Sequence, residues 1–130
     1  MIVVDASVLA PALAEDGPSG DLARARLRGE ELAAPELVDL EVAAVLRRFL
    51  TRGLVDGRRA QLALGDLVAM PLQRAAHLDL LPRVWALRDN LTPYDAAYVA
   101  LAEQLDVPLL TADARLAGAP APTCPIELLA

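Results

Sequence analysis

Lysine is absent from this chain of 130 residues, and the residues that often act as nucleophiles or general bases are scarce. Without lysine there is no P-loop lysine, no Schiff-base lysine and no lysine of a phospho-acceptor receiver domain. His77 is the only histidine and has no recognisable acid–base partner. Ser7 and Ser19 are the only serines, and neither lies in a nucleophile-elbow motif. These absences direct attention to the acidic residues.

Long apolar runs and a basic N-terminal segment are also missing. No stretch approaches the roughly 18 uncharged residues that a membrane span needs. The first residues, MIVVDAS, carry an acid where a signal peptide would carry positive charge. The single cysteine, Cys124, cannot form an internal disulfide, which fits a reducing compartment. We therefore expect a cytoplasmic protein without a membrane partner.

The length and composition are those of one folded domain, covering residues 1–130. Apolar residues make up 55% of the chain, enough to form a sizeable core. The net charge of −6 argues against broad, non-specific binding to nucleic acid.

All 12 basic residues are arginine, and five of them gather in one stretch: Arg47, Arg48, Arg52, Arg58 and Arg59. Arginine grips phosphates through paired N–H donors, so this stretch could form a small rim that holds a nucleic acid. A solvated helix face with an arginine-biased composition explains it equally well. The sequence leaves both interpretations open.

Short apolar runs alternate with helical segments. Strands are expected at Ile2–Val4, Leu32–Ala34, Pro71–Ala75, Val107–Thr111 and Pro125–Leu129. The first expected helix is capped by Ser7 and runs to Ala14, and a loop at 16–20 separates it from a second helix over Asp21–Arg28. Further helices are expected from Pro35 to just before Gly53, over Arg58–Ala69, over Leu78–Arg88 and from Thr92-Pro93 to Leu105. A helical turn is expected at Ala114–Leu116. This alternation predicts an α/β layer fold in which helices flank a mainly parallel sheet.

Four acids lie where such a fold could bring them to a common point: Asp5, Glu41, Asp95 and Asp113. Asp5 and Asp113 follow two of the expected strands, and the carboxyl ends of parallel strands share one edge of a sheet. Asp95 lies near the start of the helix that begins at Thr92. Glu41 lies on an apolar helical stripe, where an inward-facing carboxylate needs a partner.

Each acid also has an ordinary explanation. Asp5 could precede a helix cap, Asp95 could compensate a helix dipole, and Asp113 could begin a turn. Glu41 could pair with an arginine of its own helix. Together they are harder to explain in this way, because clustered carboxylates repel one another and lose water. Such clusters commonly hold a hard divalent cation, so the sequence points to metal-dependent chemistry.

Other acids compete for a place in this cluster. Glu36 and Asp39 flank Glu41 in the sequence, and Asp89 precedes Asp95. Their helical surroundings are more mixed, which is typical of surface residues. Periodicity alone does not decide between the two sets.

Three segments carry the acids in a familiar order: VVDASVL, LEVAAVLRR and TPYDAAYVALAEQLDVPLLTADARL. They resemble the motifs of the PIN-domain ribonucleases, and more narrowly those of the VapC-type toxins of toxin–antitoxin pairs. The third segment is the most specific, and the first alone would be weak. The resemblance covers nearly the whole chain in motif order and length.

The resemblance implies a PIN-like three-layer fold and an endoribonuclease that uses Mg²⁺, or Mn²⁺, to hydrolyse RNA phosphodiesters with a metal-activated water. The metal-binding and catalytic acids would be Asp5, Glu41, Asp95 and Asp113. Ser7 and Thr111 would be supporting polar residues beside them. Some relatives carry a further acid soon after the last aspartate, where this chain has Ala114-Arg115-Leu116. Whether the site holds one ion or two stays open.

The resemblance also implies partners: a cognate antitoxin protein, an RNA substrate and a second copy in a homodimer, with no direct DNA binding. The net charge of −6 suits a basic partner segment. The helices Asp21–Arg28 and Glu36–Leu50 could supply dimer surfaces, although burial in the core explains their apolar faces equally well.

Two other interpretations stay open. One is another metal-dependent nuclease or phosphohydrolase on a similar fold. A haloacid-dehalogenase-type phosphatase would need Asp-x-Asp where this chain has Asp5-Ala6-Ser7, and a lysine that it lacks. The other is a non-catalytic PIN-like interaction module, against which the presence of all four acids weighs.

Overall fold

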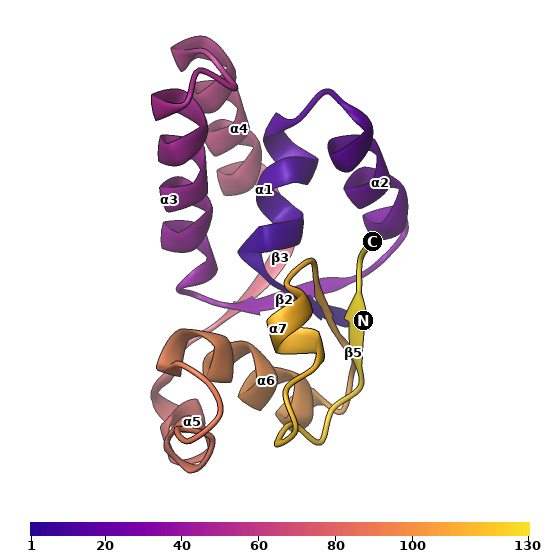
Figure 1. The fold of residues 1–130 in the computed structure, drawn as a ribbon, viewed down its shortest axis with the longest axis vertical. Helices are drawn as coiled ribbons and strands as arrows, with labels where there is room; N and C mark the ends of the chain where they lie inside the picture. The colour runs from indigo at the N-terminus through magenta and orange to yellow at the C-terminus, as the bar shows by residue number, and fades with distance from the viewer.

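Five short parallel strands form the central sheet of the computed structural model, which describes residues 1–130 (Figure 1). The strands are β1 (Ile2–Val4), β2 (Leu32–Pro35), β3 (Leu72–Ala75), β4 (Leu109–Thr111) and β5 (Ile126–Leu128). They lie in the order β3-β2-β1-β4-β5, and every neighbouring pair is parallel. The strands expected from the sequence are all present: β1 has the predicted bounds, β2 extends one residue further, and β3, β4 and β5 are slightly shorter.

The strand order reverses at β1. The chain adds β2 and β3 successively on one side of β1 and then returns to place β4 on the other side. Val4 of β1 is in register with Leu110 of β4. In open α/β sheets such a switch point leaves a crevice beyond the carboxyl ends of the two strands. The residues that follow β1 and β4 therefore occupy the natural position for a site.

Helices cover both faces of this sheet. They are α1 (Ala6–Ala14), α2 (Pro18–Leu27), α3 (Val38–Thr51), α4 (Gly57–Ala69), α5 (Leu81–Ala86), α6 (Pro93–Leu105) and α7 (Ala114–Ala117), with a 3₁₀ turn at Leu78–Leu80. Figure 1 shows α1 to α4 on one side of the sheet and α5 and α6 on the other. This arrangement confirms the expected three-layer α/β fold. No helix combines the length and the apolar character needed to cross a membrane.

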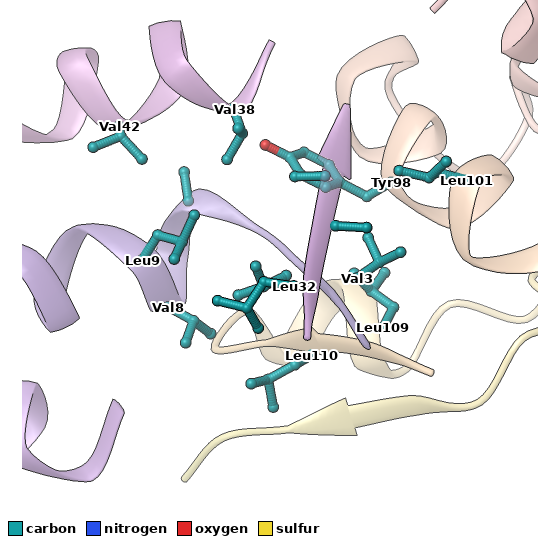
Figure 2. Close-up of a cluster of buried hydrophobic side chains, with 14 of the residues drawn as sticks. Val3, Val8, Leu9, Leu32, Val38, Val42, Tyr98, Leu101, Leu109 and Leu110 are labelled. Carbon is teal, nitrogen blue, oxygen red and sulfur yellow. The ribbon is translucent and has the colours of Figure 1, made fainter. Parts of the chain in front are cut away.

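The core lies on both faces of the sheet. Figure 2 shows Leu9 of α1 and Val42 of α3 on one side of the strands, and Tyr98 and Leu101 of α6 on the other. All four are at most 3% exposed. Burying an aliphatic side chain of this size contributes about 1.5–3 kcal/mol. The sheet faces are thus closed by apolar contacts, and polar groups are left for the ends of the strands.

Helix α1 begins earlier than the sequence indicated, and the predicted cap is wrong. Asp5, not Ser7, is the capping residue: its carboxylate accepts a hydrogen bond from the backbone N–H of Ser7 at 3.1 Å. A carboxylate at the end of β1 already satisfies a free N–H of the first turn, so Ser7 lies inside the helix. Asp5 consequently links the sheet edge to the start of α1.

Pro35 ends strand β2 and does not open helix α3, so that prediction is also wrong. Pro35 is in register with Ala75 of β3, and helix α3 starts only at Val38. On the other side β2 pairs with β1 only through Leu32 and Ala33. The missing N–H of Pro35 therefore interrupts no ladder bond to β1.

Two other boundaries differ from the prediction. Helix α2 begins at Pro18, inside the stretch 16–20 expected to be a loop, because proline suits the first turn of a helix. The helix expected over Leu78–Arg88 is divided into the 3₁₀ turn and α5, with Pro82 in the first turn of α5. The predicted stop at Gly53 is confirmed, since Gly53 follows α3 with a φ of +71°.

Candidate functional site

All four predicted acids line one cavity of about 370 Å³ at the switch point. Its lining residues are Asp5, Ala6, Ser7 and Pro11 around the start of α1, Glu41, Ala44, Val45 and Arg48 of α3, Asp95 and Tyr98 of α6, and Asp113 after β4. Four separate parts of the chain thus meet here. A larger hollow, beside the loop between α1 and α2, contains none of the four acids.

Asp5 is the most buried of the acids, with only 6% of its surface exposed. Its carboxylate accepts hydrogen bonds from the backbone N–H and the hydroxyl of Ser7, and from the hydroxyl of Thr111. Burial raises the pKa of Asp5, and these hydrogen bonds only partly oppose that rise. No cation of the protein pairs with this carboxylate.

Ser7 and Thr111 connect the ends of β1 and β4. The Ser7 hydroxyl accepts a hydrogen bond from the backbone N–H of Ala112 at 2.8 Å. The Thr111 hydroxyl accepts one from the backbone N–H of Asp113 at 3.0 Å. Each hydroxyl therefore donates to Asp5 while it accepts from the loop after β4. This places both residues beside the acids, as the resemblance implied, and gives them a physical task there.

Glu41 reaches the cavity from the first turns of α3. Its carboxylate accepts a hydrogen bond from the hydroxyl of Tyr98 at 2.5 Å, and neither of the neighbouring arginines of its helix pairs with it. Burial raises the pKa of Glu41, the Tyr98 hydrogen bond opposes the rise, and the charges of Asp95 and Asp5 add to it. Two of the other acids, Asp95 and Asp5, therefore interact electrostatically with Glu41.

Tyr98 is the site residue that the sequence did not reveal. It is 1% exposed, and its ring packs in the core while its hydroxyl reaches Glu41. Its pKa lies far above the ordinary value, first because of burial and then because of Glu41. A signal was present in the sequence: Tyr98 follows Asp95 by three residues, so both lie on one face of the same helix.

Asp95 stands in the first turn of α6, as expected. The side chain of Thr92 caps this helix by accepting a hydrogen bond from the Asp95 backbone N–H at 3.2 Å. Burial raises the pKa of Asp95, and the negative charge of Asp113 raises it further. The helix N-terminus thus fixes the position of Asp95, while the negative charge of Asp113 makes ionisation of its carboxylate less favourable.

Asp113 differs from the other three because it has its own cation. One carboxylate oxygen caps α7 by accepting from the Arg115 backbone N–H, and the other accepts from the Arg115 guanidinium, both at 2.9 Å. The hydrogen bond from the Arg115 side chain holds the pKa of Asp113 below its usual range. Arg115 itself is exposed.

The donor set fits a hard divalent cation in its chemistry, since carboxylate oxygens are the ligands that Mg²⁺ and Mn²⁺ prefer. No three acidic, histidine or cysteine side chains are arranged so that they could hold an ion without moving. The reason is visible in the contacts: Asp5 is held by Ser7 and Thr111, Glu41 by Tyr98 and Asp113 by Arg115. Binding an ion would require the carboxylates to move closer together within the cavity.

The competing acids lie outside the cavity. Glu36 and Asp89 are exposed, and Asp39 forms an ion pair of 2.8 Å with Arg74. The structure therefore separates Glu41 from its neighbours in sequence, which periodicity could not do.

Comparison with known proteins supplies the family. The PIN domain family matches residues 2–121. A VapC ribonuclease of Mycobacterium bovis is 44% identical over 99% of this chain and 98% of its own length. Ribonuclease VapC1 of Mycobacterium tuberculosis is 44% identical over 98% of this chain and 96% of its own length.

Solved structures share the fold at low sequence identity. Mycobacterium tuberculosis VapC20, described as a toxin that cleaves the sarcin–ricin loop, superposes with a TM-score of 0.71 at 17% identity, over 92% of this chain and 97% of its own. VapBC2 from Rickettsia felis, bound to a DNA fragment from its promoter, gives a TM-score of 0.70 at 13% identity over the whole of both chains. At these identities the likeness concerns the fold alone.

Proposed function

The chain belongs to the PIN domain family and to its VapC type, and on that premise we propose that it is an endoribonuclease toxin of a toxin–antitoxin pair. The observation that carries this proposal is the single cavity lined by Asp5, Glu41, Asp95 and Asp113. The 44% identity to proteins named as ribonucleases, along almost the full length of both chains, supports the same activity.

We propose further that these four carboxylates bind Mg²⁺ or Mn²⁺. When bound, such an ion lowers the pKa of a water and neutralises charge on a phosphodiester. The raised pKa values of Asp5, Glu41 and Asp95 support this, because burial disfavours their ionised forms, and at Glu41 and Asp95 the charges of neighbouring acids add to that cost. A bound divalent cation would offset this cost of ionising the three carboxyl groups.

The surrounding residues have separate tasks in this proposal. Ser7 and Thr111 hold the carboxylate of Asp5, and Tyr98 orients that of Glu41 through its hydroxyl. Outer partners of this kind fix the geometry and basicity of metal ligands. Asp113 has to release or share its bond to Arg115 when it turns toward the cavity.

A cognate antitoxin and an RNA substrate are the proposed partners. The structure of VapBC2 from Rickettsia felis, which shares this fold, supports an antitoxin partner. The chain's charge of −6 favours a basic antitoxin segment over the acids. We also propose a homodimer, for which α3, with Leu40 and Leu50 exposed, offers more apolar surface than α2, with Leu22.

Cleavage of RNA tests the activity and its metal dependence together. A labelled single-stranded RNA is incubated with the protein in Mg²⁺ and, in parallel, in EDTA, and new 5′-phosphate ends are mapped. We expect cleavage in Mg²⁺ only, and its loss in Asp5→Ala and Asp95→Ala. Cleavage that persists in EDTA, or full activity in both variants, contradicts the proposal.

A further inference from the structure

Only one arginine of the basic stretch in residues 47–59 lines the acidic cavity, and it is Arg48. Its neighbour Arg47 lines a different groove, between α3 and α4, together with Leu46 and Leu64. Arg59 lies beside Asp16, with 3.4 Å between the guanidinium and the carboxylate. The structure thus divides a stretch that the sequence could treat only as a whole.

The guanidinium of Arg48 has no partner in the protein. It is exposed and takes part in none of the ion pairs, although four carboxylates line the same cavity. Arg115, the other arginine beside the acids, is bound to Asp113. An arginine that lines an acidic cavity without pairing is available to an anion from outside.

The position of Arg48 on α3 sets which anion it can reach. It follows Glu41 by seven residues, which returns it to nearly the same face of the helix and about 10 Å further along the axis. The backbone of Arg48 therefore lies about two helical turns from that of Glu41, and both residues line the same cavity.

We propose that Arg48 binds a backbone phosphate of the RNA strand adjacent to the phosphodiester held at the acids. This inference rests on the proposed function. Four carboxylates repel a polyanion, so a strand that enters the cavity needs a cation beside its path. The planar guanidinium supplies paired N–H donors for phosphate oxygens, and its offset along α3 directs them to a neighbouring nucleotide. Arg48 is then a substrate-positioning residue, not a part of the hydrolytic centre.

Salt-dependent binding of RNA tests this contact. Fluorescence anisotropy measures the affinity of a labelled single-stranded RNA in EDTA, where the proposed hydrolysis does not run. Each phosphate contact to a single strand contributes about 0.7 to the slope of log affinity against log salt. We expect Arg48→Ala to weaken binding about tenfold at low salt and to reduce that slope by about 0.7.

Arg47→Ala is the matched control, because Arg47 is the adjacent residue of α3, is also exposed and is also free of ion pairs. We expect it to leave the slope unchanged, and Arg48→Lys to keep the slope while restoring only part of the affinity. Equal losses in both alanine variants, no loss in Arg48→Ala, or wild-type protein that does not bind RNA would overturn the inference. If Arg48→Ala binds RNA as well as the wild type, the ligand of Arg48 would instead be an acidic group of a protein partner.

Cleavage kinetics separate this inference from the proposed function. We expect Arg48→Ala to raise KM in Mg²⁺ about tenfold and to leave kcat within about twofold, since a contact to a non-reacting phosphate contributes uniform binding. A fall in kcat with unchanged KM would overturn the inference while the nuclease assignment stands. Wild-type protein without metal-dependent cleavage would instead overturn the proposed function.

Discussion

Two aspartates stand at the ends of neighbouring strands and have opposite surroundings. Asp5 follows β1, is 6% exposed, and has its pKa raised by burial. Asp113 follows β4, keeps 29% of its side chain exposed, and has its pKa lowered by Arg115. The sheet brings both to one edge, because β1 and β4 are parallel and adjacent.

The topology of the sheet sets where each aspartate stands, while its immediate neighbours set the pKa of its carboxylate. Asp5 has only hydroxyl and amide donors around it, so a cation would relieve an existing cost there. Asp113 already has a cation in Arg115, which a metal ion would have to displace. A bound ion should therefore gain most at Asp5 and compete at Asp113.

Removing the carboxylate of either Asp5 or Asp113 should have the largest effect on activity. We predict that Asp5→Asn and Asp113→Asn each lower kcat/KM for RNA cleavage by more than about 100-fold, because loss of a metal ligand should exceed the 10–100-fold cost of losing an outer partner. Asp89→Asn, at an exposed acid outside the cavity, is the control and should retain activity. Near-normal cleavage by either site variant would remove that residue from the proposed metal site.

The hydroxyl that joins the two aspartates should come next. Thr111→Val removes the donor to Asp5 and the acceptor for the Asp113 backbone N–H. We expect about a 10–100-fold loss of cleavage and a destabilisation of about 1–3 kcal/mol, measured by urea unfolding. Thr123→Val is the control, since its hydroxyl binds the carboxylate of Glu103 away from the cavity. Equal cleavage by the two variants would contradict the supporting role.

The pKa shifts make the stability of the metal-free protein depend on pH, with opposite signs for Asp5 and Asp113. Asp5, Glu41 and Asp95 have raised pKa values, so the folded state binds more protons than the unfolded one between the ordinary and the raised pKa. Their effect on stability therefore becomes more favourable as the pH falls through the raised pKa values. Asp113, with a lowered pKa, stabilises above its unfolded pKa, and that stability is lost as the pH falls through its folded pKa.

Thermal unfolding in EDTA checks this sign. We expect the contribution of Asp5 to appear as a gain in Tm as the pH is lowered through its raised pKa toward its ordinary value, and we expect Asp5→Asn to lack that gain. Mg²⁺ at pH 7 should raise Tm in its place, because it neutralises the same carboxylates. A wild-type Tm that falls monotonically from pH 7 while Asp5→Asn behaves identically would contradict the account.

The smallest expected effect concerns Arg115. Arg115→Ala frees Asp113 to turn toward the cavity and lets the pKa of Asp113 rise toward its ordinary value. We predict an increase of a few-fold in apparent Mg²⁺ affinity, measured by the metal dependence of Tm. Arg88→Ala is a suitable control, because Arg88 stacks on Trp85 and bonds only a nearby carbonyl. Weaker metal binding in Arg115→Ala would show that Arg115 assists the ion instead of competing with it.

Much of the fold could be predicted because its signals are local. The buried runs Ile2–Val4 and Leu109–Thr111 are short and apolar, and Thr92-Pro93 marks a helix start from adjacent residues alone. The errors at Ser7 and Pro35 have another origin. Both residues suit a helix start, but the carboxylate of Asp5 takes the capping position before Ser7, and pairing with Ala75 of β3 keeps Pro35 in a strand.

The site was predictable in its members but not in its contacts. Placement at two strand ends and at a helix start pointed to Asp5, Asp113 and Asp95, while the choice of Glu41 over Asp39 needed the resemblance. Tyr98 looked like an ordinary core residue, because its partner Glu41 lies 57 positions away in the sequence. Arg115 pairs with Asp113 only two positions away, yet nothing in the sequence distinguishes Arg115 from an exposed arginine that has no partner.

Calorimetric titration of metal-free protein with Mn²⁺ at pH 7 tests the central claim most directly, because it needs neither RNA nor an antitoxin. We predict saturable binding to the wild type that is lost in Asp5→Asn and retained in Asp89→Asn. Absence of binding to the wild type, or equal binding to Asp5→Asn, would contradict the claim that the four acids of this cavity form a metal site.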